Sequence, residues 1–547
     1  MNFKIRTCWP LVTSLFIYWA AVAILVFLAT GMNGGHFVYP LDDTYIHMSI
    51  AKSTATSGIW GVTPYAFTSS TSSPFWTFLL AVTYLVFGIH DSAALILALI
   101  CGSLLIGAIY VTLARYLKSP GRIFLSLLIL IFVTPLPSLT FTGMEHVLHI
   151  LLFTVFLFLA IPLLLARNKP TFKEAQSTLI VAPFLVVTRY ESLFLAFVIC
   201  AILFFQRKIL LSVILGAVSL FPAVIYGAWS AANGWYWLPN SVLLKGHRPH
   251  LSLSVSSILN QFGGGALDVI EANPHILLLV IFSLLVILRY PPRENRGQND
   301  IRWAHIVFLG CVLLHMQFAG MGWFFRYDAY LVFMGLALVA ISVNELLPES
   351  WIGILKEKGL LAAGVLTLFV VVVGIPFYNR ASVALEITPW ASKNIYEQQY
   401  QMASFLRRYY PDGRVAANDI GAITYFTNIR LVDLVGLGTM ETAKWRLNQS
   451  LTTQRVDLLT QRRGVSLALV YDSWFTAPNG RSSLPPSWVK VAEWKITHNV
   501  VCGGDTVSIF ATSAQGVEAL KGNLRKFASE MPSDVQQAGP YLQAPNQ

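Results

Sequence analysis

Two adjacent carboxylates, Asp42 and Asp43, follow the first long apolar run of the chain. Two like charges at the edge of an apolar segment repel each other, so one is expected to have a raised pKa unless a cation or a metal compensates. A carboxylate tuned in this way can act as a general base toward a hydroxyl group. Asp is also a common helix N-cap, and the dipeptide leaves both interpretations open. A cap would, however, use only one of the two residues.

Three basic residues are candidates for holding an anion near this carboxylate pair: Arg189, Lys245 and Arg326. Arg holds a phosphate through a two-pronged fork, and Lys holds it as a point charge. Simpler interpretations remain, because Arg326 follows an aromatic run and could anchor the chain at a membrane interface. Lys245 could equally be a solvated loop charge. A hydroxyl-rich, uncharged loop at residues 61–74 could contact sugar or phosphate oxygens, or be only a flexible polar loop.

The elements that position these residues are expected to be membrane helices. Of the 547 residues, 55% are hydrophobic and 12% are charged, against roughly 25% charged residues in an ordinary soluble domain. This composition excludes a soluble enzyme as the whole protein, and it excludes disorder. The apolar runs are long and unbroken rather than alternating, which predicts a polytopic α-helical membrane protein.

The distribution of charge predicts about eleven spans with the N-terminus inside and the C-terminus outside. Lys and Arg outnumber Asp and Glu by 38 to 27, and they gather in short loops that the positive-inside rule places in the cytoplasm. The segment 74–88 is predicted to be a half-buried outer helix, because a span there would put Arg115, Lys118 and Arg122 outside. The predicted spans are 11–30, 92–114, 123–139, 147–166, 177–188, 192–205, 209–231, 275–290, 303–320, 328–345 and 359–377.

Three domains follow from this pattern. Residues 1–377 form a transmembrane domain with a long outer loop at 32–91, and residues 378–530 form an extracytoplasmic α/β domain. The strands of the second domain are predicted at 414–418, 431–435, 465–471, 489–496 and 507–511, with helical stretches near 393–409 and 441–463. The Pro-, Gln- and Ser-rich residues 531–547 are predicted to be disordered. The five cysteines form neither a disulfide framework nor a metal knuckle.

An ordered set of short motifs resembles integral-membrane glycosyltransferases of the GT-C superfamily. The similarity is to the protein-mannosyltransferase-like and arabinofuranosyltransferase-like branches. No single motif is specific, but the set covers most of the chain in order. The motifs are Asp42-Asp43-Thr44-Tyr45-Ile46, Ser72-Ser73-Pro74-Phe75-Trp76-Thr77, Thr142-Gly143-Met144-Glu145, Thr188-Arg189-Tyr190-Glu191, Leu238-Pro239-Asn240-Ser241 with Lys245, Arg326-Tyr327, Asn418-Asp419-Ile420-Gly421-Ala422-Ile423 and Asp433-Leu434-Val435-Gly436-Leu437.

The resemblance implies an enzyme that moves a hexose or pentose from a polyprenyl-phosphate donor to a cell-envelope glycan, lipid or protein. It implies a bacterial inner (plasma) membrane location, with the active site and the C-terminal domain extracytoplasmic and no nucleic-acid partner. Asp42 or Asp43 would be the base, with the first acid of the pair favoured, and Arg189, Lys245 and Arg326 would hold the donor phosphate. No cofactor is certain, and use of a divalent cation stays open. Further candidates for substrate contact are Tyr45, Glu145, Glu191, Asn240 and Trp237.

A transporter or flippase of a lipid-linked glycan is the alternative function. Such a protein should carry ionisable residues near the bilayer midplane, and many transporters show inverted repeats. The centres of the predicted spans are nearly free of ionisable residues, and the sequence shows no internal repeat. The carboxylate pair on one face therefore favours chemistry over translocation.

Overall fold

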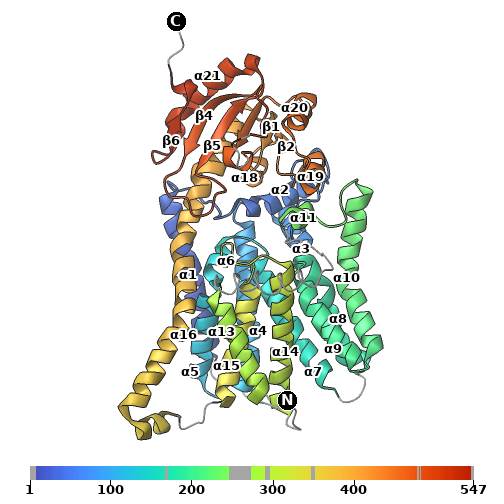
Figure 1. The fold of residues 1–547 in the computed structure, drawn as a ribbon, viewed down its shortest axis with the longest axis vertical. Coiled ribbons are helices and arrows are strands. Elements are labelled where there is room, and N and C mark those ends of the chain that lie inside the picture. Colours follow the sequence, from blue (N-terminus) through green and yellow to red (C-terminus); the bar gives the residue numbers. More distant parts are fainter. Residues whose placement is uncertain are drawn as a thin grey trace.

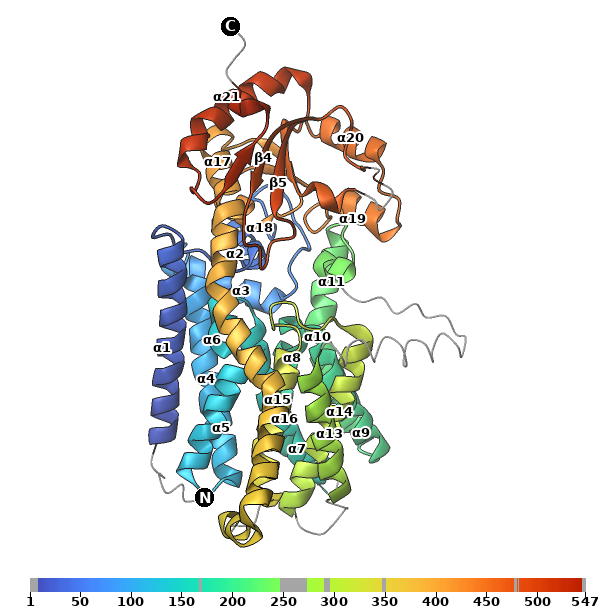
Figure 2. The ribbon, with the colours of Figure 1, turned by 60° about the vertical axis from the view of Figure 1, so that its left-hand side comes forward.

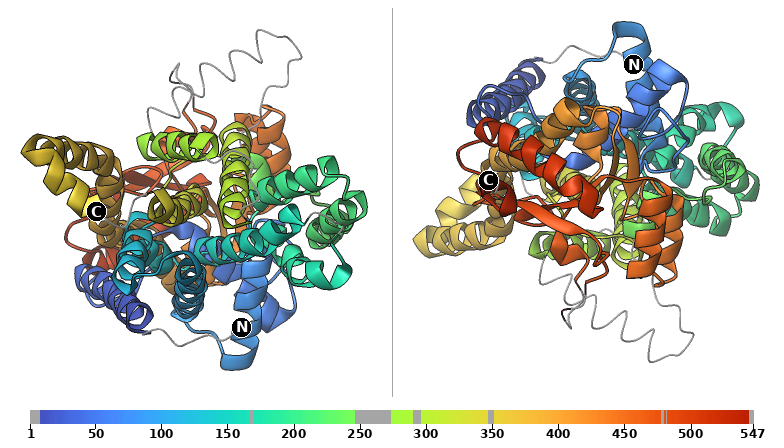
Figure 3. Two further views of the ribbon diagram at one scale, coloured as in Figure 1. Left: turned by 90° about the horizontal axis from the view of Figure 1, so that it is seen from below. Right: turned by 90° about the horizontal axis from the view of Figure 1, so that it is seen from above.

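A bundle of long helices carries a sheet domain at one end (Figure 1). The computed structural model describes residues 8–166, 170–245, 273–289, 296–346, 351–476, 480 and 482–543. Seen along the bundle, α1 and α16 lie on one side and α8 to α10 on the opposite side (Figure 3). The sheet domain sits over the bundle end at which α2 and α3 lie.

Helices coincide with all eleven predicted spans. Six helices within the described residues are long and apolar enough to cross a membrane by length and composition, so the chain is a multi-pass membrane protein. The helices are α1 (Trp9–Met32), α4 (Ala93–Tyr116), α5 (Pro120–Val133), α7 (His146–Leu165), α8 (Phe172–Thr188), α9 (Ser192–Phe205), α10 (Ile209–Ala232), α13 (Pro274–Arg289), α14 (Arg296–Phe318), α15 (Ala329–Leu346) and α16 (Trp351–Ile395).

The run predicted as one helix over 123–139 is broken in the structure. α5 ends at Val133, and a separate short helix, α6 (Leu136–Phe141), follows. Pro135 and Pro137 explain the break, because proline lacks a backbone N–H and disfavours a helical conformation in the residue before it.

Two helices lie across the end of the bundle beneath the sheet domain (Figures 1 and 2). They are α2 (Asp42–Ser57) and α3 (Pro74–Phe87). The 14 residues of α3 are too few for a span, which needs about 20 residues. One side of α3 is buried through Trp76 and Leu80, while Phe78 and Leu85 are exposed on the other. This pattern agrees with the half-buried helix predicted for segment 74–88.

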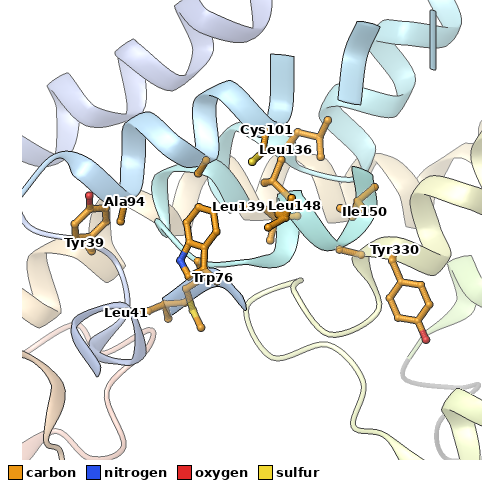
Figure 4. Packing of buried hydrophobic residues seen from close by; sticks show 14 of the residues in the cluster. Tyr39, Leu41, Trp76, Ala94, Cys101, Leu136, Leu139, Leu148, Ile150 and Tyr330 are labelled. Carbon is orange, nitrogen blue, oxygen red and sulfur yellow. The ribbon is translucent and has the colours of Figure 1, made fainter. Parts of the chain in front are cut away.

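The buried side of α3 belongs to a core that joins the bundle to the site. Trp76, Tyr39 and Leu41 pack against residues of α4, α6 and α7 (Figure 4). The indole N–H of Trp76 donates to the carbonyl oxygen of Gly143, at 3.2 Å. Gly143 has a φ of +65°, and a Cβ there would lie 2.6 Å from the Tyr39 ring. The close approach of these segments therefore depends on glycine at position 143.

The predicted domain boundary at residue 378 falls inside α16. This helix has 45 residues and a length of about 68 Å at 1.5 Å per residue. It passes from the bundle into the sheet domain (Figure 2) and continues through the π-helical turn η1 (Tyr396–Tyr400) into α17 (Gln401–Tyr409). The change of composition near residue 378 marks where α16 leaves the apolar bundle, and no linker separates the two parts.

The sheet domain contains one six-stranded sheet in the order β2-β1-β3-β5-β4-β6 among the described residues. β1 pairs in parallel with β2 and β3, and the remaining pairs are antiparallel. All five predicted strands are confirmed. The strands are β1 (Arg414–Ala417), β2 (Arg430–Asp433), β3 (Leu467–Val470), β4 (Val489–Lys495), β5 (Thr506–Ala511) and β6 (Gln536–Ala538), and the helices beside them are α18 (Gly421–Tyr425), α19 (Met440–Leu447), α20 (Thr453–Arg462) and α21 (Val517–Phe527).

The prediction of disorder from residue 531 onward is wrong for the part of this tail that the structure describes. β6 (Gln536–Ala538) pairs with β4 at the sheet edge, and Tyr541 is fully buried. An edge strand of three residues needs only a short stretch of backbone to pair. The polar composition of the segment therefore did not reveal it.

Candidate active site

The first acidic residue of α2 is held by the sheet domain. The Asp42 carboxylate accepts hydrogen bonds from the backbone N–H groups of Gly421, at 2.7 Å, and Ala422, at 2.8 Å. These two residues begin α18, which follows β1. A Cβ at Gly421 would lie 2.0 Å from the carbonyl oxygen of Asp42. Glycine at position 421 therefore allows the two backbones to meet.

The environment of Asp42 suits a base that works near neutral pH. Burial, together with the nearby charges of Asp419 and Asp43, raises the pKa of Asp42 to about 7. The two N–H donors oppose this shift by stabilising the ionised form. A carboxylate with a pKa close to the working pH is ionised often enough to accept a proton and basic enough to take it.

The second acidic residue, Asp43, is paired with a predicted phosphate ligand. Its carboxylate lies 2.7 Å from Nη2 of Arg326, which comes from the segment between α14 and α15. The Arg326 guanidinium also lies 2.8 Å from the sulfur of Met144 and 5.1 Å from the centre of the Tyr327 ring. The preceding residues 323–325 all have positive φ, between 28° and 59°. The backbone conformation just before Arg326 is therefore energetically unfavourable, as is common at functional sites.

The corner between α8 and α9 contributes the other predicted arginine. Arg189 lies 2.8 Å from Glu145 through Nη1 and 3.0 Å from Glu191 through Nε. The far oxygen of Glu145 lies 3.4 Å from Nε2 of His47. Arg189 and Glu145 are 7% and 0% exposed, so these ion pairs lie in a largely dry cluster.

Two cavities meet at the Asp43–Arg326 pair. The first cavity, of about 290 Å³, lies between the corner of α8 and α9 and the start of α2. The second cavity, of about 380 Å³, lies between α2 and the sheet domain. Asp43, Arg326 and Tyr327 line both. Asp42 and Asp419 line the second cavity, and Arg189, Glu191 and His47 line the first.

An apolar groove of about 560 Å³ adjoins the first cavity between α9, α10 and α14. Leu193, Phe194 and Phe318 line both hollows. The remaining groove residues are also apolar or small, for example Phe197 and Leu220. The apolar groove is therefore next to a cavity that is lined by charged side chains.

Several predicted contact residues lie away from the cavities. Tyr45 is 1% exposed, and its hydroxyl accepts the backbone N–H of Tyr39 at 3.0 Å. The side-chain amide of Asn240 donates to the carbonyl oxygen of Gly436 at 2.7 Å. Trp237 is 58% exposed and lines neither cavity. Lys245 ends the short helix α11 (Asn240–Lys245), and its side chain lies outside the described part of the chain.

Asp419 is a site residue that the sequence reasoning did not assign. It lies two residues after the end of β1 and accepts hydrogen bonds from Gln399 Nε2, at 2.8 Å, and from the Tyr471 hydroxyl, at 3.0 Å. Its position at the carboxyl end of a parallel strand was an available signal, because ligand-binding residues gather there in open α/β sheets.

No group of three or more His, Cys, Asp or Glu side chains within the described residues could hold a metal ion. The carboxylates of Asp42 and Asp43 both have protein partners: Asp42 accepts hydrogen bonds from two backbone N–H groups, and Asp43 pairs with Arg326.

The fold is similar to that of a solved membrane-protein structure, ArnT. The structure of ArnT from Cupriavidus metallidurans bound to undecaprenyl phosphate shares 13% sequence identity and a TM-score of 0.50, over 92% of this chain and 98% of that one. The archaeal oligosaccharyltransferase AglB from Archaeoglobus fulgidus, in complex with an inhibitory peptide and a dolichol-phosphate, gives 10% identity and a TM-score of 0.43. That match covers 91% of this chain and 74% of AglB.

Sequence comparisons add one match. Residues 393–510, which run from the end of α16 to β5, match a domain of unknown function (DUF8728). None of the curated proteins is detectably similar to the chain. The overall fold is therefore similar to that of ArnT, which agrees with the membrane fold that the motif resemblance implied.

Proposed function

We propose that the protein is a glycosyltransferase that moves a sugar from a polyprenyl-phosphate donor to a cell-envelope acceptor on the outer face of the membrane. The observation that carries this proposal is the meeting of two cavities at Asp43 and Arg326, with Asp42 beside them and an apolar groove behind. ArnT, which has the same fold, has been solved with undecaprenyl phosphate bound.

The groove and the first cavity suit a lipid-phosphate donor. The apolar walls of the groove favour burial of a prenyl chain, and the donor phosphate would then reach the chamber lined by Arg189 and Arg326. The phosphate would replace Asp43 as the partner of Arg326, since a charge-assisted bidentate pair with phosphate is favourable. The Asp43 carboxylate would then face the sugar. Lys245 remains a further proposed phosphate ligand.

The second cavity suits the acceptor hydroxyl. Asp42 would take the proton of that hydroxyl as its oxygen forms a bond to the anomeric carbon. The bond between the anomeric carbon and the phosphate oxygen breaks, and polyprenyl phosphate leaves with the electron pair. Asp43 would orient the sugar. The nearby charge of Asp419 would help to keep the pKa of Asp42 raised. Residues 1–377 would thus supply the base and the donor site, and the sheet domain would complete the acceptor site.

Release of polyprenyl phosphate tests this proposal. Purified protein in nanodiscs is incubated with a panel of hexosyl and pentosyl polyprenyl phosphates and envelope acceptor fractions. One donor should yield polyprenyl phosphate together with a glycosylated acceptor. Movement of the intact donor across the bilayer without release of polyprenyl phosphate would instead identify a flippase.

We also propose eleven spans with the N-terminus in the cytoplasm of a bacterial cell and the C-terminus outside the inner membrane. This topology puts the loops that carry Arg115, Lys118 and Arg122 inside, as the positive-inside rule requires. An alkaline phosphatase fused after Gln547 should be active, and a fluorescent cytoplasmic reporter at the same place should be dark. A fusion at Lys118 is the control and should give the reverse. An inactive phosphatase at Gln547 would contradict the orientation.

A further inference from the structure

A cavity outside the reaction site lies at the opposite end of the first two strands of the sheet. It has a volume of about 470 Å³ and lies between the outer loop at residues 62–68 and the edge of the sheet at β2. Asp419 follows the carboxyl end of β1, whereas this cavity is bordered by the amino ends of β1 and β2. Its charged and aromatic lining residues are Arg414, Arg430, Arg462, Arg463, Glu441, Tyr65, Phe67 and Trp235.

Four of the lining residues are arginines, and only one is a carboxylate. Arg463 lies 2.7 Å from Glu441, and no salt bridge forms within the described residues for the other three. Arg414 and Arg430 are direct neighbours in the parallel pairing of β1 and β2. Like charges opposite each other in a sheet are destabilising. The fold therefore maintains a positive cluster that its own contacts do not neutralise.

Aromatic side chains line the same cavity. The Arg430 guanidinium lies 4.4 Å from the centre of the Tyr65 ring, and the Tyr65 hydroxyl donates to the carbonyl oxygen of Asn428 at 2.7 Å. The ring of Tyr65 is thus held in place although 41% of the side chain is exposed. Flat aromatic faces beside hydrogen-bond donors suit a sugar ring, and guanidinium groups suit carboxylates and phosphates.

The cavity is also close to the reaction site along two segments of the chain. Thr68 lines the arginine cavity, whereas Ser70 lines the first reaction cavity. Likewise, Gly438 lines the arginine cavity, whereas its neighbour Leu437 lines the first reaction cavity. A glycan held here would therefore be kept beside the site of transfer.

We infer that this cavity is a binding site for an anionic saccharide, one that carries a carboxylate or a phosphate on its sugar ring. Three unneutralised guanidinium groups would hold the anion, and Tyr65 would contact the sugar. This role is separate from catalysis and does not require the transferase reaction. It would keep an acidic envelope glycan at the surface of the enzyme.

Direct binding to the intact protein in detergent tests the site. Calorimetry would compare a uronic-acid oligosaccharide, a hexose 6-phosphate, inorganic phosphate and a neutral oligosaccharide. The uronic-acid oligosaccharide or the hexose 6-phosphate should bind. Whichever binds more tightly shows whether the site recognises a carboxylate or a phosphate. The neutral sugar should bind at least about tenfold more weakly, and binding should weaken as salt screens the charges.

Two sets of variants make the test specific. The double variant Arg430→Gln, Arg462→Gln should weaken binding of the anionic sugar at least about tenfold, since each arginine supplies charge-assisted hydrogen bonds. Arg407→Gln on α17, an exposed arginine that does not line the cavity, is the matched control and should bind as wild type. Tyr65→Ala should weaken sugar binding and leave phosphate binding unchanged. Equal binding by the double variant and wild type, or equal binding of neutral and anionic sugars, would overturn the inference.

Discussion

Asp42→Asn is expected to lower the rate of sugar transfer by about 10²–10⁴-fold, the usual contribution of a general base. The amide keeps the volume of the side chain and can still accept one of the two N–H groups of residues 421 and 422. Donor binding should stay near wild type, because Arg189 and Arg326 line the first cavity and Asp42 does not. Transfer rate and donor affinity would be measured separately in nanodiscs. Near wild-type rates for both Asp42→Asn and Asp43→Asn would mean that neither carboxylate is the base.

The pH profile distinguishes a base from a structural carboxylate. Since the pKa of Asp42 is raised to about 7, wild-type kcat/KM should rise as the pH is raised through about 7 and then level off. Asp42→Asn should lack this rise. A raised pKa also means that the folding stability supplied by protonated Asp42 is present at low pH and is lost between about pH 4 and pH 7. The variant should therefore lose less thermal stability than wild type over that interval.

Arg189→Met is expected to destabilise the protein by about 3–5 kcal/mol, the usual effect of removing one partner from a buried ionic cluster. The variant leaves Glu145 and Glu191 close together without the arginine that lies 2.8 Å and 3.0 Å from them. Unfolding in detergent, followed by intrinsic fluorescence, would measure the loss.

A triple variant separates stability from donor binding. Adding Glu145→Gln and Glu191→Gln to Arg189→Met removes the uncompensated charges and should recover most of the lost stability. Donor affinity should stay low, because the proposed phosphate ligand is absent. A single variant Arg189→Met as stable as wild type would show that the cluster contributes no net stability.

The sequence was sufficient for the helices of the bundle because each one is a long apolar run. It was misleading in two places where polar residues belong to a regular helix or strand. The polar residues after 377 continue the helix α16, and the polar residues 536–538 form an edge strand. In both places the backbone hydrogen bonds depend on neighbours that composition does not reveal.

The candidate site was predictable in its residue types and less so in its contacts. The sequence indicated Asp43 and Arg326 as residues of one site, without predicting a contact between them, and they lie 2.7 Å apart. It did not indicate that Arg189 lies between Glu145 and Glu191, since Glu145 comes from a separate segment 44 residues before Arg189. Tyr45 matched a motif but is packed against Tyr39 and Tyr425, because an aromatic side chain serves a core as readily as a ligand.

The hydrogen bonds between Asp42 and the N–H groups of Gly421 and Ala422 have a consequence for the newly made protein. The two partners are separated by 379 residues, which a ribosome needs about 20–75 s to add at 5–20 residues per second. Throughout that interval α2 has been synthesised, but the segment that holds its first carboxylate has not. The carboxylate of Asp42 can therefore reach its final environment only after Gly421 and Ala422 have been made, and a chain that stops before Gly421 would reach the membrane without this contact.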